Sequence, residues 1–421
     1  MIGVKYVKKI LLLVTDSFPF GFGEAPFILP ELPHLQKEFD KLIIFSMNIT
    51  EYKTNDISSD IFVYRRRTKY TLFNKIIYGV KSLFTSLLWE EISSIKQNYG
   101  LSLSRIKDAI KYMIISSSIL KEILSLELIN NKENKFLLYT YWYTEGTLAA
   151  IRLKKYYPQL KVITRTHGYD LYLERKRNSY QPFKKWMDKR IDRVYFVSLA
   201  GEKYYKEHYK CSEDKYFLSY LGVRSPVPCV QWKLSSHKVL LSCSSIIPIK
   251  RVELIIYGLS KINNIKIHWV HFGGGAEENS MKQLAKKLLG HKENITYDFR
   301  GTVQNSKVIN YISKKSIDSF ISTSFTEGLP VSMMEAASYK IPIIGTNVGG
   351  IGEIVIPSGG VLLPQNPTSQ EVAEAIETVL SWDETTMLDK REQVYRTWKE
   401  LFDADRNGQK FAKEISNLFD K

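Results

Sequence analysis

The chain has 421 residues, with 60 Lys or Arg against 44 Asp or Glu, a formal net charge of +16 and 44% hydrophobic residues. This apolar content excludes a wholly disordered chain and is sufficient for two domains of ordinary size. The positive charge lies almost entirely in the first half, because residues 1–220 carry 36 basic and 23 acidic side chains whereas residues 221–421 carry 24 and 21. A basic surface attracts phosphate-bearing partners such as nucleic acid, anionic lipid or phosphorylated ligands.

Short apolar runs alternate with longer mixed segments and predict parallel strands connected by helices. In the first half the predicted strands are 10–14, 42–45, 136–139, 162–164 and 194–197. Pro226, Pro228 and two adjacent serines interrupt the pattern between Val223 and His237, which predicts a linker. The alternation then restarts, with predicted strands at 239–242, 267–272, 295–299, 319–322 and 341–345. A polar tail of helical pattern follows Trp382.

This order of elements predicts an α/β fold with two doubly wound, Rossmann-like domains. We place the first domain at residues 1–225 and the second at residues 237–395. A helical tail at residues 396–421 is expected to pack back on the first domain. Ligands of such folds bind at the carboxyl ends of the strands, so a deep cleft between the two domains is the expected site.

The cysteines and the N-terminus indicate the compartment. Cys211, Cys229 and Cys243 are too few and too scattered for a disulfide framework or a zinc site, which fits a reducing cytoplasm. The apolar run at 10–14 is too short for a signal peptide, and no stretch reaches the roughly 18 apolar residues of a spanning helix. We therefore expect a soluble protein or one attached peripherally to a membrane.

A basic, aromatic segment at residues 64–90 leaves two interpretations open. Arg65, Arg66 and Arg67 begin it, and lysines alternate with aromatic residues after them. It is either a solvated helical face over a stripe of core residues or an interfacial segment that lies on an anionic bilayer.

The most informative stretch follows a predicted strand and reads Ser-Phe-Thr-Glu-Gly-Leu-Pro-Val-Ser-Met-Met-Glu-Ala from Ser324. Pro330 suits the first turn of a helix, and Gly328 lets the backbone approach a ligand. Backbone N–H groups at the start of that helix favour an anion such as phosphate. Glu327 at the mouth of the site and Glu335 within the helix can accept hydrogen bonds from the vicinal hydroxyls of a sugar or a ribose.

This stretch resembles the Glu, seven residues, Glu motif of glycosyltransferase family 4, the retaining, nucleotide-sugar-dependent enzymes of the GT-B fold. The resemblance extends over nearly the whole chain, through ordered motifs at residues 17–24, 165–170, 247–251, 272–275, 299–301 and 347–353. It implies that the loop with Gly21 and Gly23 approaches the donor diphosphate, and that His167 contacts the donor sugar or its phosphate. Besides His167 and Glu327 in catalysis, it implies donor binding by Gly21, Gly23, Lys250, Arg251, Gly273, Arg300, Gly328, Leu329, Pro330 and Glu335.

Two of these predictions also follow from local chemistry. His167 stands beside Gly168 and Asp170 at a predicted strand end, where functional residues gather. Lys250 and Arg251 begin a predicted helix, which is the unfavourable end for cations unless an anion binds there.

One departure from the family pattern concerns the phosphates. Many members carry an Arg five or six residues before the phosphate-binding Lys, where this chain has Ser245 and Ser244. The diphosphate contact would then rest on Lys250 and Arg251, a point charge beside a planar fork.

Together these features predict a retaining glycosyltransferase that moves a hexosyl group from a nucleoside diphosphate sugar to a hydroxyl of a lipid-linked glycan in bacterial surface polysaccharide synthesis. No cofactor and no metal are expected, because no His, Cys or carboxylate cluster has metal-ligand spacing. We expect a cytoplasmic protein on the inner face of the membrane, attached through Arg65, Arg66 and Arg67, and no nucleic-acid partner.

Two alternatives stay open at this point. A nucleotide-sugar epimerase of the GT-B fold also uses two such domains, although its acid/base pattern is not visible here. A noncatalytic basic protein that binds membrane or nucleic acid would explain the charge but leaves the motif series without a role.

Overall fold

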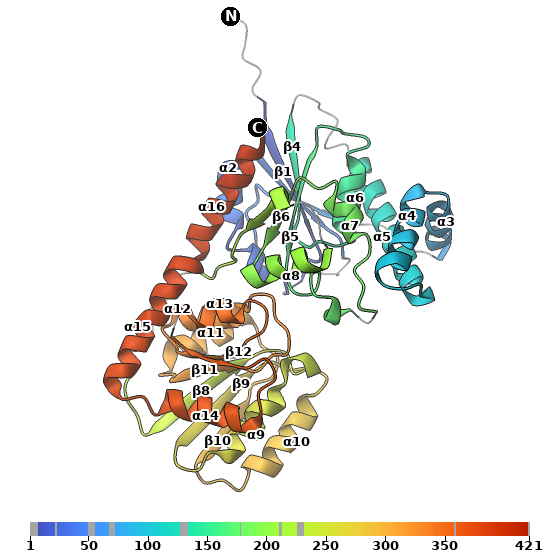
Figure 1. Ribbon diagram of the computed structural model, residues 1–421. Helices are drawn as coiled ribbons and strands as arrows, with labels where there is room; N and C mark the ends of the chain where they lie inside the picture. The colour runs from blue at the N-terminus through green and yellow to red at the C-terminus, as the bar shows by residue number, and fades with distance from the viewer. Residues whose placement is uncertain are drawn as a thin grey trace, which may run out of the picture. The chain divides into compact units, whose positions relative to one another are not determined.

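The computed structural model describes residues 7–21, 23–48, 55–66, 72–126, 134–176, 178–209, 213–224, 231–357 and 359–419. Two compact α/β units make up the chain, each built on one parallel sheet (Figure 1). The first unit comprises Met1–Ser219 and Gly408–Lys421, and the second comprises Tyr220–Asn407. Of the tail predicted at 396–421, the part from Gly408 onward thus belongs with the first unit.

The first unit contains a parallel sheet of seven strands in the order β3-β2-β1-β4-β5-β6-β7. The five strands predicted for this half of the chain are confirmed to within two residues. The edge strands β3 and β7 were not predicted, because they are short and only partly buried. The strands are β1 (Lys9–Thr15), β2 (Lys41–Ser46), β3 (Phe62–Arg65), β4 (Lys135–Thr140), β5 (Lys161–Thr166), β6 (Arg193–Phe196) and β7 (Tyr216–Leu218).

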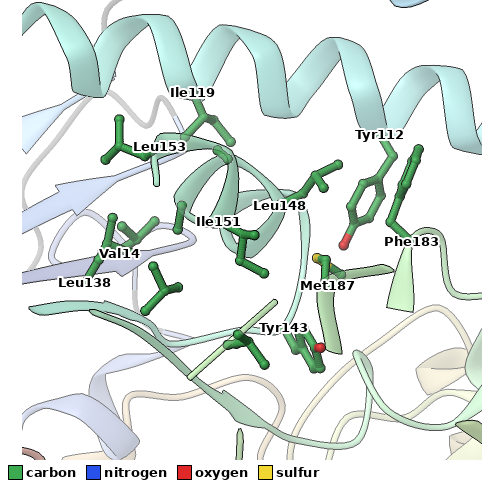
Figure 2. Packing of buried hydrophobic residues seen from close by; sticks show 14 of the residues in the cluster. Val14, Tyr112, Ile119, Leu138, Tyr143, Leu148, Ile151, Leu153, Phe183 and Met187 are labelled. Carbon is green, nitrogen blue, oxygen red and sulfur yellow. The ribbon is translucent and has the colours of Figure 1, made fainter. Parts of the chain in front are cut away.

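Helices cover both faces of this sheet because alternate residues of its central strands are buried on opposite sides. Leu12 and Val14 of β1 belong to a core with α5 and α6, where Ile119, Leu148 and Ile151 meet (Figure 2). Leu11 and Leu13 belong to the opposite core, which includes α1, α2 and the end of α16. The helices are α1 (Ala25–Ile28), α2 (Leu32–Glu38), α3 (Leu72–Leu83), α4 (Ser86–Asn98), α5 (Leu103–Ser125), α6 (Glu145–Leu153), α7 (Lys184–Asp188), α8 (Leu199–Tyr209) and α16 (Ala404–Ser416).

The second unit contains a parallel sheet of six strands in the order β10-β9-β8-β11-β12-β13. Its strands are β8 (His237–Cys243), β9 (Lys266–Phe272), β10 (Ile295–Phe299), β11 (Ser319–Ser322), β12 (Ile343–Thr346) and β13 (Val361–Leu363). Its helices are α9 (Val252–Lys261), α10 (Glu278–Leu289), α11 (Asn305–Lys314), α12 (Val331–Ser338), α13 (Ile351–Val355), α14 (Ser369–Leu380) and α15 (Glu384–Leu401). Trp269 and Ile321 lie in the core under α9 and α14.

Each sheet has one point where the strand order reverses, between β1 and β4 in the first unit and between β8 and β11 in the second. The loops that leave the carboxyl ends of these strands diverge to opposite faces, which makes a crevice for ligands. The fold therefore points to the loops after β1, β4, β8 and β11. Among the described residues, no helix combines the length and the apolar character needed to cross a bilayer.

The segment at 64–90 is divided among three elements. It is not one helix: β3 contains Arg65, and α3 and α4 follow later in the chain. Arg66 is 5% exposed, donates to the Ser118 hydroxyl at 2.8 Å and pairs with Glu122 at 3.4 Å. The predicted membrane contact is therefore wrong for Arg66, which fastens the end of β3 to α5. Arg67 lies outside the described residues.

Candidate active site

The loops after β8 and β11 bring two predicted site residues into contact. Lys250 ends a short 3-10 helix, Pro248–Lys250, in the loop after β8. Its ammonium group forms an ion pair with the carboxylate of Glu327, which lies in the loop after β11. The pair therefore spans the point where the second sheet reverses its strand order.

The surroundings of Glu327 make this pair sensitive to a ligand. Glu327 is 8% exposed, and its carboxylate also accepts a hydrogen bond from the Ser324 hydroxyl at 2.9 Å. A buried charge that loses its partner is strongly destabilised. A ligand that inserts here must therefore offer an anion to Lys250 and donors to Glu327. A phosphate beside sugar hydroxyls satisfies both requirements.

Arg251 acts on the same loop from behind. Its Nε donates to the carbonyl of Thr323 at 2.8 Å, and its Nη2 donates to the carbonyl of Ser324 at 2.9 Å. Two further bonds reach the Gln365 carbonyl at 2.8 Å and the Asn366 amide oxygen at 3.0 Å. The guanidinium thus positions the loop that leads to α12, and the contact of Arg251 with the donor phosphates stays a prediction.

The start of α12 follows directly. Pro330 occupies the N-cap position with φ −75°, so the helix begins at Val331, one residue after the predicted proline. Leu329 is buried, and the carbonyl of Gly328 accepts the N–H of Gly350 at 2.7 Å. The loops after β11 and β12 are thus fastened together beside the helix N-terminus, where the dipole favours an anion.

Glu335 lies within α12 and is 7% exposed. Asn305, the first residue of α11, donates its amide N–H to the carboxylate at 2.8 Å. Burial raises the pKa of Glu335 to about 7, and the Asn305 hydrogen bond opposes that rise only in part. Such a carboxyl gains from a ligand hydroxyl, because a further donor favours its ionised form.

Gly273 and Arg300 lie at the ends of β9 and β10. A Cβ on Gly273 would stand 1.8 Å from the carbonyl oxygen of Ser244, and its φ is +128°. Only glycine fits there, so the loop after β9 presses against the loop after β8. Arg300 is partly exposed and pairs with Asp298 at 2.5 Å, with its guanidinium 5.9 Å from the centre of the Tyr311 ring.

In the first unit, the loop after β1 is held by Glu24. Its carboxylate accepts the backbone N–H groups of Asp16, Ser17 and Phe18 at 2.9, 2.6 and 2.7 Å. These N–H groups are thereby occupied, so a donor diphosphate at this loop would depend on its glycine-containing part. A Cβ on Gly23 would meet no atom within 4 Å.

His167 follows β5 and is 6% exposed. Its ring lies 4.3 Å from the Trp142 ring and 4.9 Å from the Tyr141 ring, centre to centre. The Asp170 carboxylate accepts the His167 backbone N–H at 2.7 Å but stands 4.0 Å from Nδ1. Within the described part of the chain, both ring nitrogens are buried without a hydrogen-bond partner. A buried imidazole left in this state is suited to a ligand.

A cavity of about 560 Å³ opens beside the ends of β1 and β4 in the first unit. Aromatic rings and charged groups line it, including Asp16, Lys111, Trp142, Glu145, Tyr169 and Lys176. Burial raises the pKa of Asp16 to about 6 and also raises the pKa of Glu145. The cavity therefore offers acceptors, cations and flat apolar faces, a combination suited to a polyhydroxylated ligand.

Several site residues escaped the sequence analysis. Trp142 and Glu145 carry no motif, and Glu24 ends the motif at 17–24 without an assigned role. A contact across the fold involves two of them, because the Trp142 indole donates to Glu24 at 2.7 Å over 118 positions. Asn305 likewise meets Glu335 from another helix. The sequence also pointed to the region of Trp142 and Glu145, because both follow the end of a correctly predicted strand.

In the comparison with known proteins, the family match falls in the second unit. Residues 231–397 match the family described as Glycosyl transferases group 1, and this range contains Lys250, Glu327 and Glu335. The O-antigen biosynthesis glycosyltransferase WbnH of Escherichia coli is 30% identical over 217 residues, which are 51% of this chain and 59% of that protein. The chain thus spans less than two thirds of the length of this curated relative.

Solved structures agree with the architecture over the full length. A glycosyltransferase from Rickettsia africae superimposes with a TM-score of 0.67 and 17% identity, covering 99% of this chain and 100% of that one. Anabaena HepE, solved in complex with UDP and glucose, gives a TM-score of 0.64 and 16% identity, covering 97% and 99%. The chain has the fold of the GT-B glycosyltransferases, with two Rossmann-like sheets.

Proposed function

We propose that this protein is a retaining glycosyltransferase that transfers a hexosyl group from a nucleoside diphosphate sugar to a hydroxyl of a lipid-linked glycan in bacterial surface polysaccharide synthesis. The observation that carries the proposal is the ion pair between Lys250 and Glu327 at the reversal point of the second sheet. The group 1 glycosyltransferase match over 231–397 and the O-antigen relative support it. The proposal includes no cofactor and no metal.

In the proposed donor site, the diphosphate binds to the ammonium of Lys250 and to the N-terminus of α12. Together they stabilise the charge that develops on the leaving group. Glu327 accepts hydrogen bonds from hydroxyls of the hexose, and Glu335 accepts them from the ribose. Arg251 keeps the loop before α12 in place while these contacts exchange.

The chemical step follows from this placement. The bond between the anomeric carbon and the phosphate oxygen breaks, and the electron pair leaves with the diphosphate. The acceptor hydroxyl attacks from the same face and passes its proton to the leaving phosphate oxygen, so the anomeric configuration is retained. His167, with its unpaired ring nitrogens, hydrogen-bonds the donor sugar or its phosphate in this proposal.

The test uses purified full-length protein and a panel of UDP, GDP, dTDP and ADP hexoses in a titration calorimeter. One or more donors should bind to the parent protein, and Lys250→Ala and Glu327→Ala should bind that donor at least tenfold more weakly. Lys266→Ala is the matched control, because this exposed lysine begins β9, at the opposite end of the sheet. Absence of any donor binding, or equal binding by all four proteins, contradicts the proposal.

Peripheral attachment to the inner face of the membrane is part of the same proposal. With Arg66 buried, other side chains must provide the contact. Helix α3 exposes Ile76, Val80 and Leu83, which lie on one face at helical spacing, and Lys75 and Lys81 are exposed beside them. A basic helix with an apolar exposed face is suited to the surface of an anionic bilayer.

A further inference from the structure

A second cavity in the first unit differs in character from the polar one. It measures about 480 Å³ and is lined by Ile110, Ile114 and Ile115 of α5 together with Lys75, Lys107 and Lys111. Lys75 comes from α3, which packs along α5. We call this cavity the α3–α5 groove. Its walls are apolar, and its cationic groups are all lysines.

The α3–α5 groove and the polar cavity share one residue. Lys111 lines both of them. Lys107 and Lys111 are one helical turn apart on α5, so their Cα atoms are about 6 Å apart along the helix axis. The next residue, Tyr112, points into the core and lines the polar cavity, which fixes this part of α5 (Figure 2). The apolar groove and the polar cavity therefore lie next to each other at Lys111, and Lys107 lines the groove one turn away.

Within the part of the chain that the structure describes, the lysines at this junction have carboxylate neighbours only beyond ion-pair distance. Across the described residues, no carboxylate stands within ion-pair distance of Lys75, Lys107 or Lys111. The Glu145 carboxyl in the polar cavity interacts with Lys111 only through longer-range electrostatics. Asp108, on the same helix, accepts a hydrogen bond from the Asn178 amide. Two exposed ammonium groups beside isoleucine side chains suit a ligand that joins an anion to a hydrocarbon chain.

We propose that the acceptor is an amphiphile bound across this junction: its hydrocarbon chain lies in the α3–α5 groove, its phosphate lies on Lys107 and Lys111, and its sugar occupies the polar cavity. In that cavity, Trp142 and Tyr169 supply flat faces for the sugar ring, and Asp16 and Glu145 accept its hydroxyls. This inference rests on the proposed function, because it names the acceptor of that reaction. The phosphate bound by Lys107 and Lys111 is the lipid phosphate of the acceptor, not a headgroup of the surrounding bilayer.

Titration calorimetry with n-dodecyl phosphate, below its micelle concentration, tests the inference on the full-length protein. We expect one site per chain, with an affinity at least tenfold above that for inorganic phosphate or for neutral n-dodecyl glucoside. The double substitution Lys107→Ala/Lys111→Ala should weaken dodecyl phosphate at least tenfold. Lys121→Ala, which removes an exposed lysine from the same helix outside both cavities, should leave it unchanged.

A second variant tests the apolar part. Ile110→Gln places a polar but uncharged group in the groove and should weaken dodecyl phosphate at least tenfold while inorganic phosphate binds as before. Circular dichroism melting of each variant should match the parent, so that loss of binding reports on the groove itself. Equal affinity of the parent for dodecyl phosphate and dodecyl glucoside overturns the inference.

Two further arms separate the sources of a lipid phosphate and the two proposals. The double lysine variant should still sediment with vesicles of phosphatidylglycerol and phosphatidylcholine, as the parent does. If it loses vesicle binding while its affinity for dodecyl phosphate is unchanged, the groove is a bilayer contact and the inference is overturned. A parent that binds a nucleotide sugar but not dodecyl phosphate overturns the inference alone. A parent that binds dodecyl phosphate but no nucleotide sugar overturns the proposed function, and the acceptor assignment with it.

Discussion

Lys250 and Glu327, 77 positions apart in the chain, form an ion pair between the loops after β8 and β11. Both side chains are largely buried, so each charge depends on the other for its stabilisation. A donor that inserts its phosphate and its sugar hydroxyls between them substitutes for both partners at once. In the proposed function, the pair therefore holds the two loops together until a donor replaces their mutual contact.

The first prediction separates the two roles of this pair. Glu327→Gln removes the negative charge that competes with phosphate for Lys250, so binding of the nucleoside diphosphate without sugar should be unchanged or tighter. Transfer should fall at least 100-fold, because the sugar loses a charged acceptor. Lys250→Met should weaken nucleoside diphosphate binding about 10- to 100-fold, the equivalent of about 1.5–3 kcal/mol for a hydrogen bond to a charged group. Equal weakening by both variants contradicts separate roles.

The second prediction concerns the Glu335 carboxyl, whose pKa burial raises from 4.5 to about 7. Between these pH values the folded state holds the proton more tightly than the unfolded state, so stability falls as the pH rises through this window. The difference corresponds to about 3 kcal/mol. Urea denaturation measures the unfolding free energy at pH 5 and pH 8. The parent protein should lose about this amount of stability between the two, and Glu335→Gln should not.

The control for this measurement is Glu293→Gln, which changes an exposed carboxylate before β10. It should preserve the pH dependence of the parent protein. If Glu335→Gln and the parent lose the same unfolding free energy between pH 5 and pH 8, the carboxyl does not titrate as the structure implies.

The fold was largely predictable because its central strands are buried on both faces, as in the run 10–14, and such strands appear as continuous apolar runs. The strands β3, β7 and β13 escaped prediction because three or four half-exposed residues at a sheet edge give no such run. Edge strands are specified by their neighbours in space, which the sequence pattern does not contain.

The candidate site shows the same division. The motif around Glu327 indicates a loop at a strand end, and the ion pair with Lys250 follows from two such loops meeting. The loop contacts of Arg251 did not follow from the sequence, in which a cation next to Lys250 suggests only a second phosphate ligand. Its actual partners are backbone carbonyls and an amide more than 70 positions away, and backbone acceptors have no sequence signature.

The third prediction contrasts two glycines. Gly273→Ala should destabilise the fold by about 3 kcal/mol or more, because its Cβ would overlap the Ser244 carbonyl at a φ of +128°. Gly23→Ala should change the unfolding free energy by less than about 0.5 kcal/mol, since nothing lies within 4 Å of the added Cβ. Guanidinium denaturation measures both.

Gly23→Ala also tests the predicted approach of its loop to the donor diphosphate. Because the substitution should not disturb the fold, a loss of donor affinity in this variant would mean that the added methyl group collides with the bound donor. Unchanged donor affinity in Gly23→Ala removes the loop from the donor site.

The last prediction compares two buried histidines. Both ring nitrogens of His167 lack a hydrogen-bond partner among the described residues, whereas His271 contacts the Ser242 hydroxyl at 2.8 Å and the Ser244 carbonyl at 3.2 Å. His167→Phe should leave the unfolding free energy unchanged or raise it, because an unsatisfied buried polar group costs about 1–3 kcal/mol. His271→Phe should lower it by a similar amount, because its removal leaves buried acceptors unpaired. Transfer by His167→Phe should nevertheless fall at least 100-fold. Equal loss of stability in the two variants would assign His167 a structural role and exclude it from contact with the donor.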